Sequence, residues 1–226
     1  MEKTVANRRN ILIGSGAAVV AAAAGSSVIA LFGSSPALAQ EQFDVAKLMA
    51  PAGGVADHAL GNKDSKVTLI EYLSPTCSHC KAFFDNTLPA LKAEYIDTNK
   101  ILFIPRPFVR NVLDAVVFML AEAAGEAKYH EVVDTFFKTQ NDWAISQTPA
   151  DAMFTIAQQL GFTKETYDAA LTNQTLFKGL EAVRDQASNE FKLTGTPTFY
   201  LNGKMLAAGE ITIDQLKAEI DPLLAA

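Results

Sequence analysis

The pattern of apolar and polar residues divides the chain into stretches typical of strands and stretches typical of helices. Runs rich in β-branched and aromatic residues predict strands at 67–70, 101–104 and 198–201. Between the first two runs, apolar residues recur at helical intervals, which predicts a helix over 81–97 with a kink at Pro89. The segment 105–107 holds two prolines and should close the second strand. A strand, a helix and a strand joined by a crossover of this length predict parallel strands.

Between residues 111 and 193 the pattern is helical throughout. The first predicted helix places Val112, Val116, Met119 and Ala123 on one face and ends at Gly125. Four further helices are predicted from apolar stripes or from cap residues, at 129–137, 148–161, 163–171 and 176–191. We interpret the stripes as core positions rather than as a binding surface.

The end of the chain returns to strands. The Asn-Gly pair at 202–203 is a two-residue hairpin turn that joins the run 198–201 to a further strand at 204–208. A Thr-x-x-Gln capping box at 212–215 predicts a final helix that continues to about Asp221.

The order of these elements predicts the fold class. The lead-in, residues 40–66, is broken by Pro and Gly and is expected to supply one short edge strand. His58 in the lead-in and His130 in the helical block are expected to be solvated surface residues. The chain then follows the order β-β-α-β, a block of helices, and β-β-α. This order favours an α/β fold in which an all-helical domain is inserted into a split sheet.

The first forty residues predict an export signal. The only charged residues there lie within the first nine positions, and none follows over 10–40. The apolar run 11–32 and the small-x-small tripeptide 37–39 indicate a signal, residues 1–39, that is cleaved. The run is also long enough to span a bilayer, so an uncleaved membrane anchor is the alternative.

The pair Arg8-Arg9 resembles the twin-arginine type of export signal. Asn7 and Ile13 depart from the usual pattern of that signal, which leaves the twin-arginine and general secretory routes both open. Either route delivers the mature chain to an oxidising compartment, the periplasm, where a disulfide persists.

Charge excludes two classes of partner. The chain has a net charge of −6, and removal of residues 1–39 would change it to −8. This acidic balance, without a cluster of Lys and Arg, argues against nucleic acid and against anionic membranes as partners.

The two cysteines of the chain form a C-x-x-C motif. Cys77 and Cys80 follow the strand at 67–70 and precede the first turn of the predicted helix, where unpaired N–H groups and the helix dipole stabilise a thiolate. A strand, C-x-x-C and a helix in this order predict a redox site of thioredoxin type. A structural disulfide is the weaker interpretation, because closing so short a ring stabilises a fold by only about 2 kcal/mol.

A metal site is also disfavoured. Cys77, His79 and Cys80 are three possible ligands, but they lie within four residues of one another. A structural zinc site needs a second pair of ligands, and only His58 and His130 remain. We therefore expect neither a metal nor another cofactor.

Several motifs together resemble the thioredoxin superfamily and, within it, the DsbA-like thiol oxidases that carry an inserted helical domain. The resemblance covers roughly residues 60–226. It depends on Glu71 six residues before the first cysteine, on the sequence Cys-Ser-His-Cys at 77–80, on Gly-Thr-Pro at 195–197 and on the closing hairpin and helix. It implies a thioredoxin-like domain in two parts, 40–109 and 191–226, separated by a helical domain at 110–190.

The resemblance also implies roles for individual residues. Cys77 would be the nucleophile with the exposed sulfur, and Cys80 the buried resolving thiol of a redox-active Cys77–Cys80 disulfide. His79 would stabilise the Cys77 thiolate, and a partly buried Glu71 would move protons to or from Cys80. A cis bond between Thr196 and Pro197 would present backbone groups to the substrate. Ser78 departs from the proline that is common in the oxidases.

These residues lead to one expected function and two rivals. We expect an exported dithiol oxidase that acts on folding exported proteins. The sequence does not fix its oligomeric state, although a monomer is favoured. The resemblance implies that a quinone-linked membrane oxidase reoxidises it. One rival is a disulfide isomerase or a reductase on the same fold, although the lead-in is too short for the dimerisation domain that isomerases of this superfamily carry. The other rival is a non-catalytic binding protein that works through its helical block.

Overall fold

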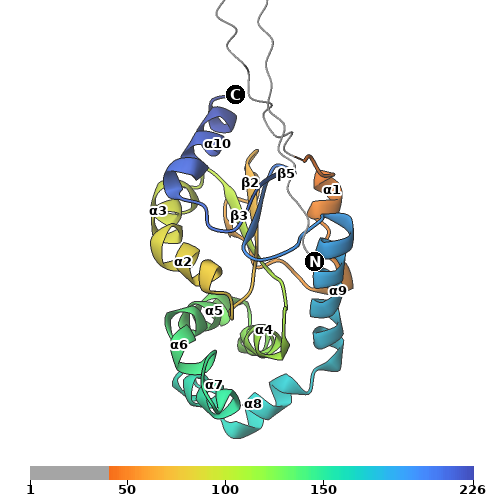
Figure 1. Ribbon diagram of the computed structural model, residues 1–226, viewed down its shortest axis with the longest axis vertical. Coiled ribbons are helices and arrows are strands. Elements are labelled where there is room, and N and C mark those ends of the chain that lie inside the picture. Colours follow the sequence, from red (N-terminus) through yellow and green to blue (C-terminus); the bar gives the residue numbers. More distant parts are fainter. Residues whose placement is uncertain (1–40) are drawn as a thin grey trace, which may run out of the picture. The chain divides into compact units, whose positions relative to one another are not determined.

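The computed structural model describes residues 41–226, so the predicted signal at 1–39 lies outside the described residues. At their centre is a five-stranded sheet with the strand order β1-β3-β2-β4-β5 (Figure 1). The strands are β1 (Leu60–Gly61), β2 (Thr68–Leu73), β3 (Leu102–Pro107), β4 (Thr198–Leu201) and β5 (Lys204–Ala208). Strands β2 and β3 are parallel, and the other neighbours are antiparallel. The predicted parallel unit, edge strand and hairpin are confirmed.

Strand β3 is longer than predicted, because its prolines do not interrupt the ladder. The sequence predicts an end at Ile104, yet pairing with β2 continues to Pro107. The N–H groups of Leu102 and Phe108 donate to the carbonyl groups of Val67, just before β2, and of Leu73 at its end. The N–H groups of even-numbered residues of β3 therefore point toward β2, and those of odd-numbered residues point away from it. The prolines at 105 and 107 therefore lie on the side where β1 has already ended and no N–H is needed.

The first described residues cover the outer edge of β5. Gln42 forms an antiparallel bridge with Lys204, and the N–H of Met205 donates to the carbonyl of Glu41 at 3.0 Å. The Glu41 carboxylate also pairs with Lys192. The start of the lead-in thus supplies partners to a strand edge that would otherwise be open.

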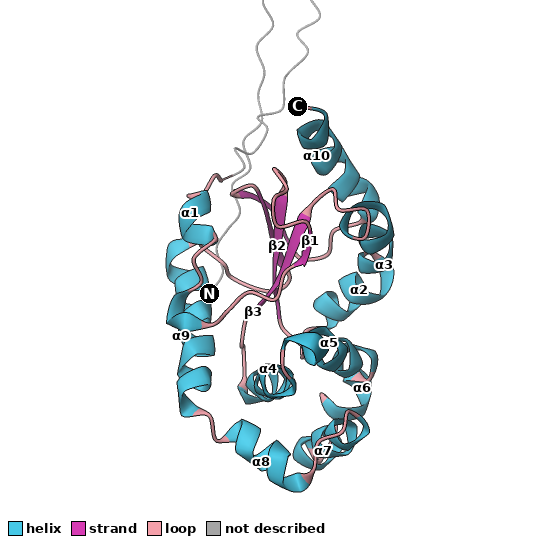
Figure 2. Ribbon diagram, turned by 180° about the vertical axis from the view of Figure 1, so that it is seen from behind, coloured by secondary structure: helices cyan, strands magenta, loops and turns pink. Residues whose placement is uncertain are grey.

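Helices cover both faces of the sheet and extend beyond one end of it (Figure 2). They are α1 (Val45–Leu48), α2 (Ser78–Asn86), α3 (Leu88–Leu91), a π-helix (Lys92–Ile96), α4 (Val112–Ala124), α5 (Tyr129–Lys138), α6 (Gln140–Trp143), α7 (Pro149–Gln159), α8 (Lys164–Leu171), α9 (Gln174–Glu190) and α10 (Ile213–Ala225). Helices α2, α3 and α10 lie on one face, and α1 and α9 lie on the other. None of the helices within 41–226 is long and apolar enough to cross a membrane.

The two faces of the sheet contribute to two hydrophobic clusters. Along β2, Leu69 packs with the helices α2, α3 and α10, whereas Ile70 and Tyr72 join a larger cluster that contains α9 and the helical block, α4–α8. Alternate residues of a strand point to opposite faces, which explains this division. Because the helical block shares a core with the sheet, it is fixed against the elements that carry the cysteines. The domain boundaries at 109/110 and 190/191 stay predictions.

The helices agree with the sequence in place but not always in extent. The predicted kink before Pro89 is confirmed, since the segment 81–97 is divided at Thr87. The capping box at 212–215 is also confirmed, but α10 continues past Asp221 to Ala225 with Pro222 inside it. The end of the helix is exposed, so the carbonyl group to which the proline cannot donate is open to solvent.

The predicted buried face of α4 is wrong in part. Val112 is exposed and so is Ala123, although Met119 is buried as expected. Residues Ala115, Val117, Phe118, Leu120 and Ala121 are buried as well. A helix that is apolar around most of its circumference gives no single stripe, because neighbours surround it.

Candidate active site

The two cysteines lie where α2 begins. Cys77 is the N-cap residue of α2 in an extended conformation, and Cys80 lies in the first turn. Both are free thiols and both are buried, Cys77 with 3 % of its surface exposed. The expectation that Cys77 presents an exposed sulfur is therefore corrected. The loop before β4 covers it, and Cys77 Sγ donates to the carbonyl oxygen of Thr196 at 3.2 Å.

The surroundings of Cys77 stabilise its ionised form. The hydrogen bond from the Cys80 side chain is the largest cause that lowers the pKa of Cys77, to about 4. The hydroxyl of Thr196 and the backbone N–H groups of Cys80 and His79 act in the same direction, against the desolvation of the sulfur. The Thr196 hydroxyl is buried and has no hydrogen-bond partner in the described part of the chain. This hydroxyl is thus free to donate a hydrogen bond to Cys77 Sγ once the Cys77 thiol has lost its proton.

The surroundings of Cys80, in contrast, favour its protonated form. Burial raises the pKa of the Cys80 thiol well above its usual range, and its hydrogen bond to Cys77 adds to the shift. The N–H of Ser74 donates to Cys80 Sγ at 3.5 Å and partly offsets the shift. At neutral pH the reduced site therefore holds a thiolate at Cys77 and a protonated thiol at Cys80.

The His79 imidazole faces solvent rather than the sulfur. Its side chain is 63 % exposed, and its Nε2 lies 3.9 Å from the carboxylate of Glu210. Among the described residues no hydrogen bond joins the ring to Cys77, and His79 acts on the thiolate through its backbone N–H. A role for the ring stays a prediction.

Glu71 lies inside the protein beneath the cysteines. It belongs to β2 and is 3 % exposed, and burial raises the pKa of its carboxyl well above the usual range, with a further contribution from the charge on Cys77. Glu71 and Cys80 line one cavity of about 40 Å³. A water molecule needs roughly 10–15 Å³ of such volume, so the cavity has room for water between carboxyl and thiol. Transfer of a proton from Glu71 to Cys80 stays a prediction.

Two histidines that were expected to be solvated surface residues are partly or largely buried. His130 lines the cavity and is half-buried, and desolvation followed by the nearby His58 lowers its pKa to about 4. His58 is largely buried: its ring stacks on Tyr129 at 3.6 Å, and its Nε2 lies 3.0 Å from the carboxylate of Glu122. Neither histidine is a solvated surface residue, because the lead-in packs against α4 and α5.

Glu71→Gln is expected to slow the reaction of the oxidised protein with a small dithiol by about 10²-fold at pH 7. When Cys77 is attacked, Cys80 leaves as a thiolate with a high proton affinity, and an amide cannot supply the proton. Rapid mixing followed by acid quench and mass spectrometry measures the rate. Glu94→Gln, which changes an exposed carboxylate paired with Lys217, is the control. An unchanged rate in Glu71→Gln would remove the proton role of Glu71.

The loop before β4 has the predicted cis bond. The peptide bond between Thr196 and Pro197 is cis, and β4 starts at the next residue. Thr196 contacts the thiol of Cys77 through its carbonyl oxygen. Binding of a substrate by Thr196 and Pro197 stays a prediction.

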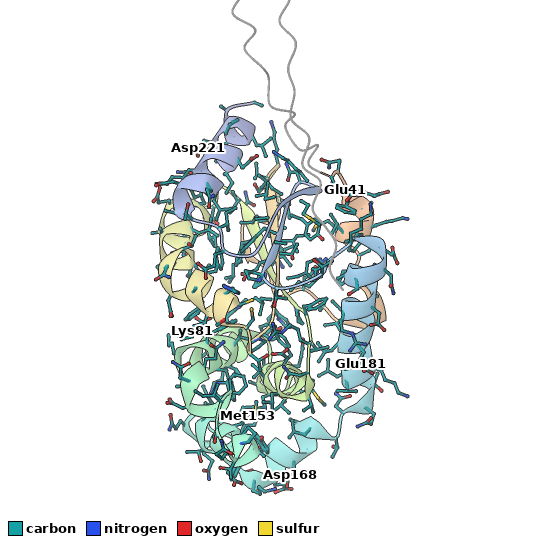
Figure 3. The ribbon with its side chains drawn as sticks, in the orientation of Figure 1. Glu41, Lys81, Met153, Asp168, Glu181 and Asp221 are labelled. Atoms are coloured by element: carbon teal, nitrogen blue, oxygen red, sulfur yellow. The ribbon has the colours of Figure 1, made fainter. Side chains whose placement is uncertain are left out.

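Two polar residues of the helical block reach the segment 74–77, and the sequence did not identify them. Asp114 of α4 accepts hydrogen bonds from Ser74 and from the N–H of Thr76, and Gln140 of α6 donates to the carbonyl oxygen of Cys77. Asp114 occupies the third position of its helix, which is the position of a capping acid. An acid at that position is common for local reasons, so its presence in the sequence is no sign of a distant contact. Lys81, the residue after Cys80, lies where α2 approaches the helical block (Figure 3).

Comparisons with known proteins agree with this geometry. A family model described as Thioredoxin matches residues 54–222. A Rickettsia bellii protein, named provisionally as a protein-disulfide oxidoreductase, is 34 % identical over 169 residues, which are 73 % of this chain and 63 % of that protein. The chain thus spans less than two thirds of this relative. The disulfide bond formation protein D of Bacillus subtilis is 26 % identical over 155 residues, 65 % of this chain and 68 % of that protein.

Solved structures show the same fold. The α-DsbA1 protein of Wolbachia pipientis superposes with a TM-score of 0.72 at 22 % identity, over 80 % of this chain and 96 % of that one. A protein-disulfide isomerase from Novosphingobium aromaticivorans superposes with a TM-score of 0.67 at 25 % identity, over 78 % of this chain and 100 % of that one. The predicted α/β class, a thioredoxin fold with inserted helices, is confirmed.

Proposed function

We propose, from the premise that this chain belongs to the thioredoxin family and has the fold of DsbA-like proteins, that it is a thiol:disulfide oxidoreductase that oxidises cysteines of other proteins. The observation that carries the proposal is the opposite tendency of the two thiols, a lowered pKa at Cys77 and a raised pKa at Cys80. A stabilised thiolate is a good leaving group, so a mixed disulfide on Cys77 readily releases its partner as the oxidised product.

The reaction follows from these positions. A substrate thiolate attacks Cys77 Sγ of the Cys77–Cys80 disulfide, and Cys80 leaves as a thiolate that takes a proton from Glu71. A second thiolate of the substrate then attacks the substrate sulfur of the mixed disulfide, and Cys77 leaves as a thiolate. The substrate loses two electrons and gains a disulfide, and the protein is reduced. An external oxidant, a membrane partner in this proposal, must restore the Cys77–Cys80 disulfide.

Equilibration with glutathione tests the proposal. An oxidase or isomerase should have a reduction potential of about −120 to −200 mV, whereas a reductant lies near about −270 mV. A value near the reductant would overturn the proposal. A Cys77 that resists alkylation at pH 6 would instead favour a non-catalytic binding protein, since a thiolate with a pKa near 4 reacts at that pH.

An isomerase remains the second candidate, because one structural neighbour is named a protein-disulfide isomerase. Two substrates separate the activities. An oxidase accelerates disulfide formation in a reduced, unfolded protein but does little for a protein with scrambled disulfides. An isomerase accelerates recovery of the scrambled protein.

Export to the periplasm belongs to the same proposal. The replacements Arg8→Lys and Arg9→Lys together are expected to retain the protein in the cytoplasm if it leaves by the twin-arginine route. Cell fractionation and immunoblotting measure the distribution, and Lys3→Arg is the control because it keeps the charge outside the arginine pair. Normal delivery of the double variant would point to the general secretory route.

A further inference from the structure

A buried carboxylate anchors the loop that leads into the cysteines. Asp114 has no exposed surface, and its oxygens accept hydrogen bonds from the hydroxyl of Ser74 at 2.9 Å, from the N–H of Thr76 at 2.8 Å and from the N–H of Arg110 at 2.9 Å. Two of these three donors belong to the redox loop, which we define as residues 74–77. A charge-assisted bond to a buried N–H is among the stronger hydrogen bonds of a protein.

A second side chain binds the residues of the redox loop that alternate with those bound by Asp114. The buried side-chain amide of Gln140 donates to the carbonyl oxygens of Pro75 at 2.7 Å and Cys77 at 3.0 Å. The helical block therefore grips the loop through an acceptor in α4 and a donor in α6. Among the hydrogen bonds of the described residues, neither side chain has one to a sulfur atom, so we trace their influence on the chemistry through the loop.

The loop in turn directs one hydrogen bond onto a cysteine. Ser74 is fixed by its hydroxyl to Asp114, and its backbone N–H points at Cys80 Sγ at 3.5 Å. The Cys80 thiol is the main donor that stabilises the Cys77 thiolate. A sulfur that accepts a hydrogen bond and donates another is polarised by the first, which strengthens the second. A chain of hydrogen bonds thus runs from Asp114 through Ser74 and Cys80 to Cys77.

We propose that Asp114 is a positioning residue of the redox site, which holds Ser74 so that the thiol of Cys80 stabilises the thiolate of Cys77. The helical block then contributes to the oxidising strength of the site as well as to the core. This inference relies on the proposed function only in taking Cys77 as the reactive thiol. Without Asp114, the N–H groups of Thr76 and Arg110 have no acceptor, and the loop moves to find one.

Asp114→Asn is the first test. An amide offers one acceptor atom where the carboxylate offers two, so at least one of the two N–H donors loses its partner. The pH dependence of Cys77 alkylation should shift upward by about one unit, and the equilibrium with glutathione should move about tenfold toward the oxidised protein. Asp151→Asn, which changes an exposed acid in the first turn of α7, is the matched control and should leave both measurements unchanged.

Ser74→Ala is the second test, because it removes only the hydroxyl that binds Asp114 and leaves the buried carboxylate with two N–H donors. It should shift the pH dependence of Cys77 alkylation upward by about half a unit and move the glutathione equilibrium about threefold toward the oxidised protein. The Asp114→Asn, Ser74→Ala double variant should show less than the sum of the two single effects, since both changes act on one contact. If Asp114→Asn does not fold, Ser74→Ala decides the matter.

These experiments distinguish failure of the proposed function from failure of the positioning role of Asp114. If the wild-type Cys77 titrates near the ordinary thiol value of about 8.5, the proposed function fails. If the wild type titrates near 4 and Ser74→Ala matches it, the positioning role of Asp114 is overturned and the proposed function stands. A loss of thermal stability without a change in alkylation or in the glutathione equilibrium would show that Asp114 serves the fold alone.

Discussion

Cells that produce the Cys80→Ala variant are expected to accumulate it in mixed disulfides with other exported proteins, joined through Cys77. The attacking thiolate of Cys77 remains, but no second thiol lies within reach to release the partner. Cys77→Ala is expected to lose oxidase activity entirely and to form no mixed disulfide, because it lacks the sulfur that the substrate thiolate attacks. Non-reducing electrophoresis followed by mass spectrometry identifies the adducts, and the Cys77→Ala, Cys80→Ala double variant is the control that should form none.

The Cys80→Ser variant makes this prediction sharper. A serine hydroxyl still donates a hydrogen bond to Cys77, whereas alanine does not, and that bond is the largest cause of the lowered pKa of Cys77. The pKa of Cys77 should therefore remain lower in Cys80→Ser than in Cys80→Ala. Mixed disulfides that form equally in Cys77→Ala and Cys80→Ala would contradict the assigned roles.

The second large effect is on stability: the reduced protein is expected to melt at a higher temperature than the oxidised protein at pH 7. The pKa of Cys77 is about 4 in the folded protein and about 8.5 in the unfolded chain. Because the folded value is the lower one, the stabilisation is complete above about 8.5 and is lost as the pH falls through about 4. At pH 7 it amounts to about 4 kcal/mol.

The disulfide stabilises the oxidised protein by less than the thiolate stabilises the reduced protein. Closing a ring of four residues lowers the entropy of the unfolded chain, and this stabilises the folded oxidised protein by only about 2 kcal/mol. Cys80 is a thiol in both the folded and the unfolded reduced chain at pH 7, and the burial of Glu71 is common to both redox forms. The difference of about 2 kcal/mol therefore favours the reduced protein at pH 7.

In acid, the oxidised protein is expected to be the more stable form. At pH 4 the thiolate contributes less than about 0.5 kcal/mol, so the oxidised form should melt higher, with equal stability between about pH 5 and pH 6. Thermal melts of both forms across this range measure the crossing. An oxidised form that melts higher at pH 7 would mean that Cys77 is not a strongly stabilised thiolate, and the oxidase proposal would give way to a reductase or a structural disulfide.

Local features of the site could be predicted from the sequence. A cysteine at the junction of a strand and a helix meets unpaired N–H groups wherever the rest of the chain lies, so the motif at 77–80 predicts its own chemistry. The Asn-Gly turn and the final capping box are equally local. The predicted cis bond before Pro197 came from the family resemblance rather than from the local residues.

Contacts between distant segments could not be predicted in this way. Asp114 occupies the first turn of α4, where an acidic residue is common for local reasons, and nothing in its sequence neighbourhood points to a loop forty residues earlier. The burial of Cys77 has the same origin, since the loop that covers it is 119 residues away in sequence. The α4 face was misassigned because a helix surrounded by others carries no polar stripe to mark an outside.

The hydrogen bonds that the lead-in makes to β5 bear on how the protein can be shortened. A strand edge with unpaired N–H and carbonyl groups is a template for another chain, and proteins that expose one tend to aggregate. Glu41 and Gln42 occupy that edge here. A chain trimmed to begin after Phe43 would expose the edge of β5 and favour edge-to-edge association between copies, although the residues of the redox site would be unchanged. Soluble variants of this protein should therefore keep the few residues that follow the predicted cleavage site.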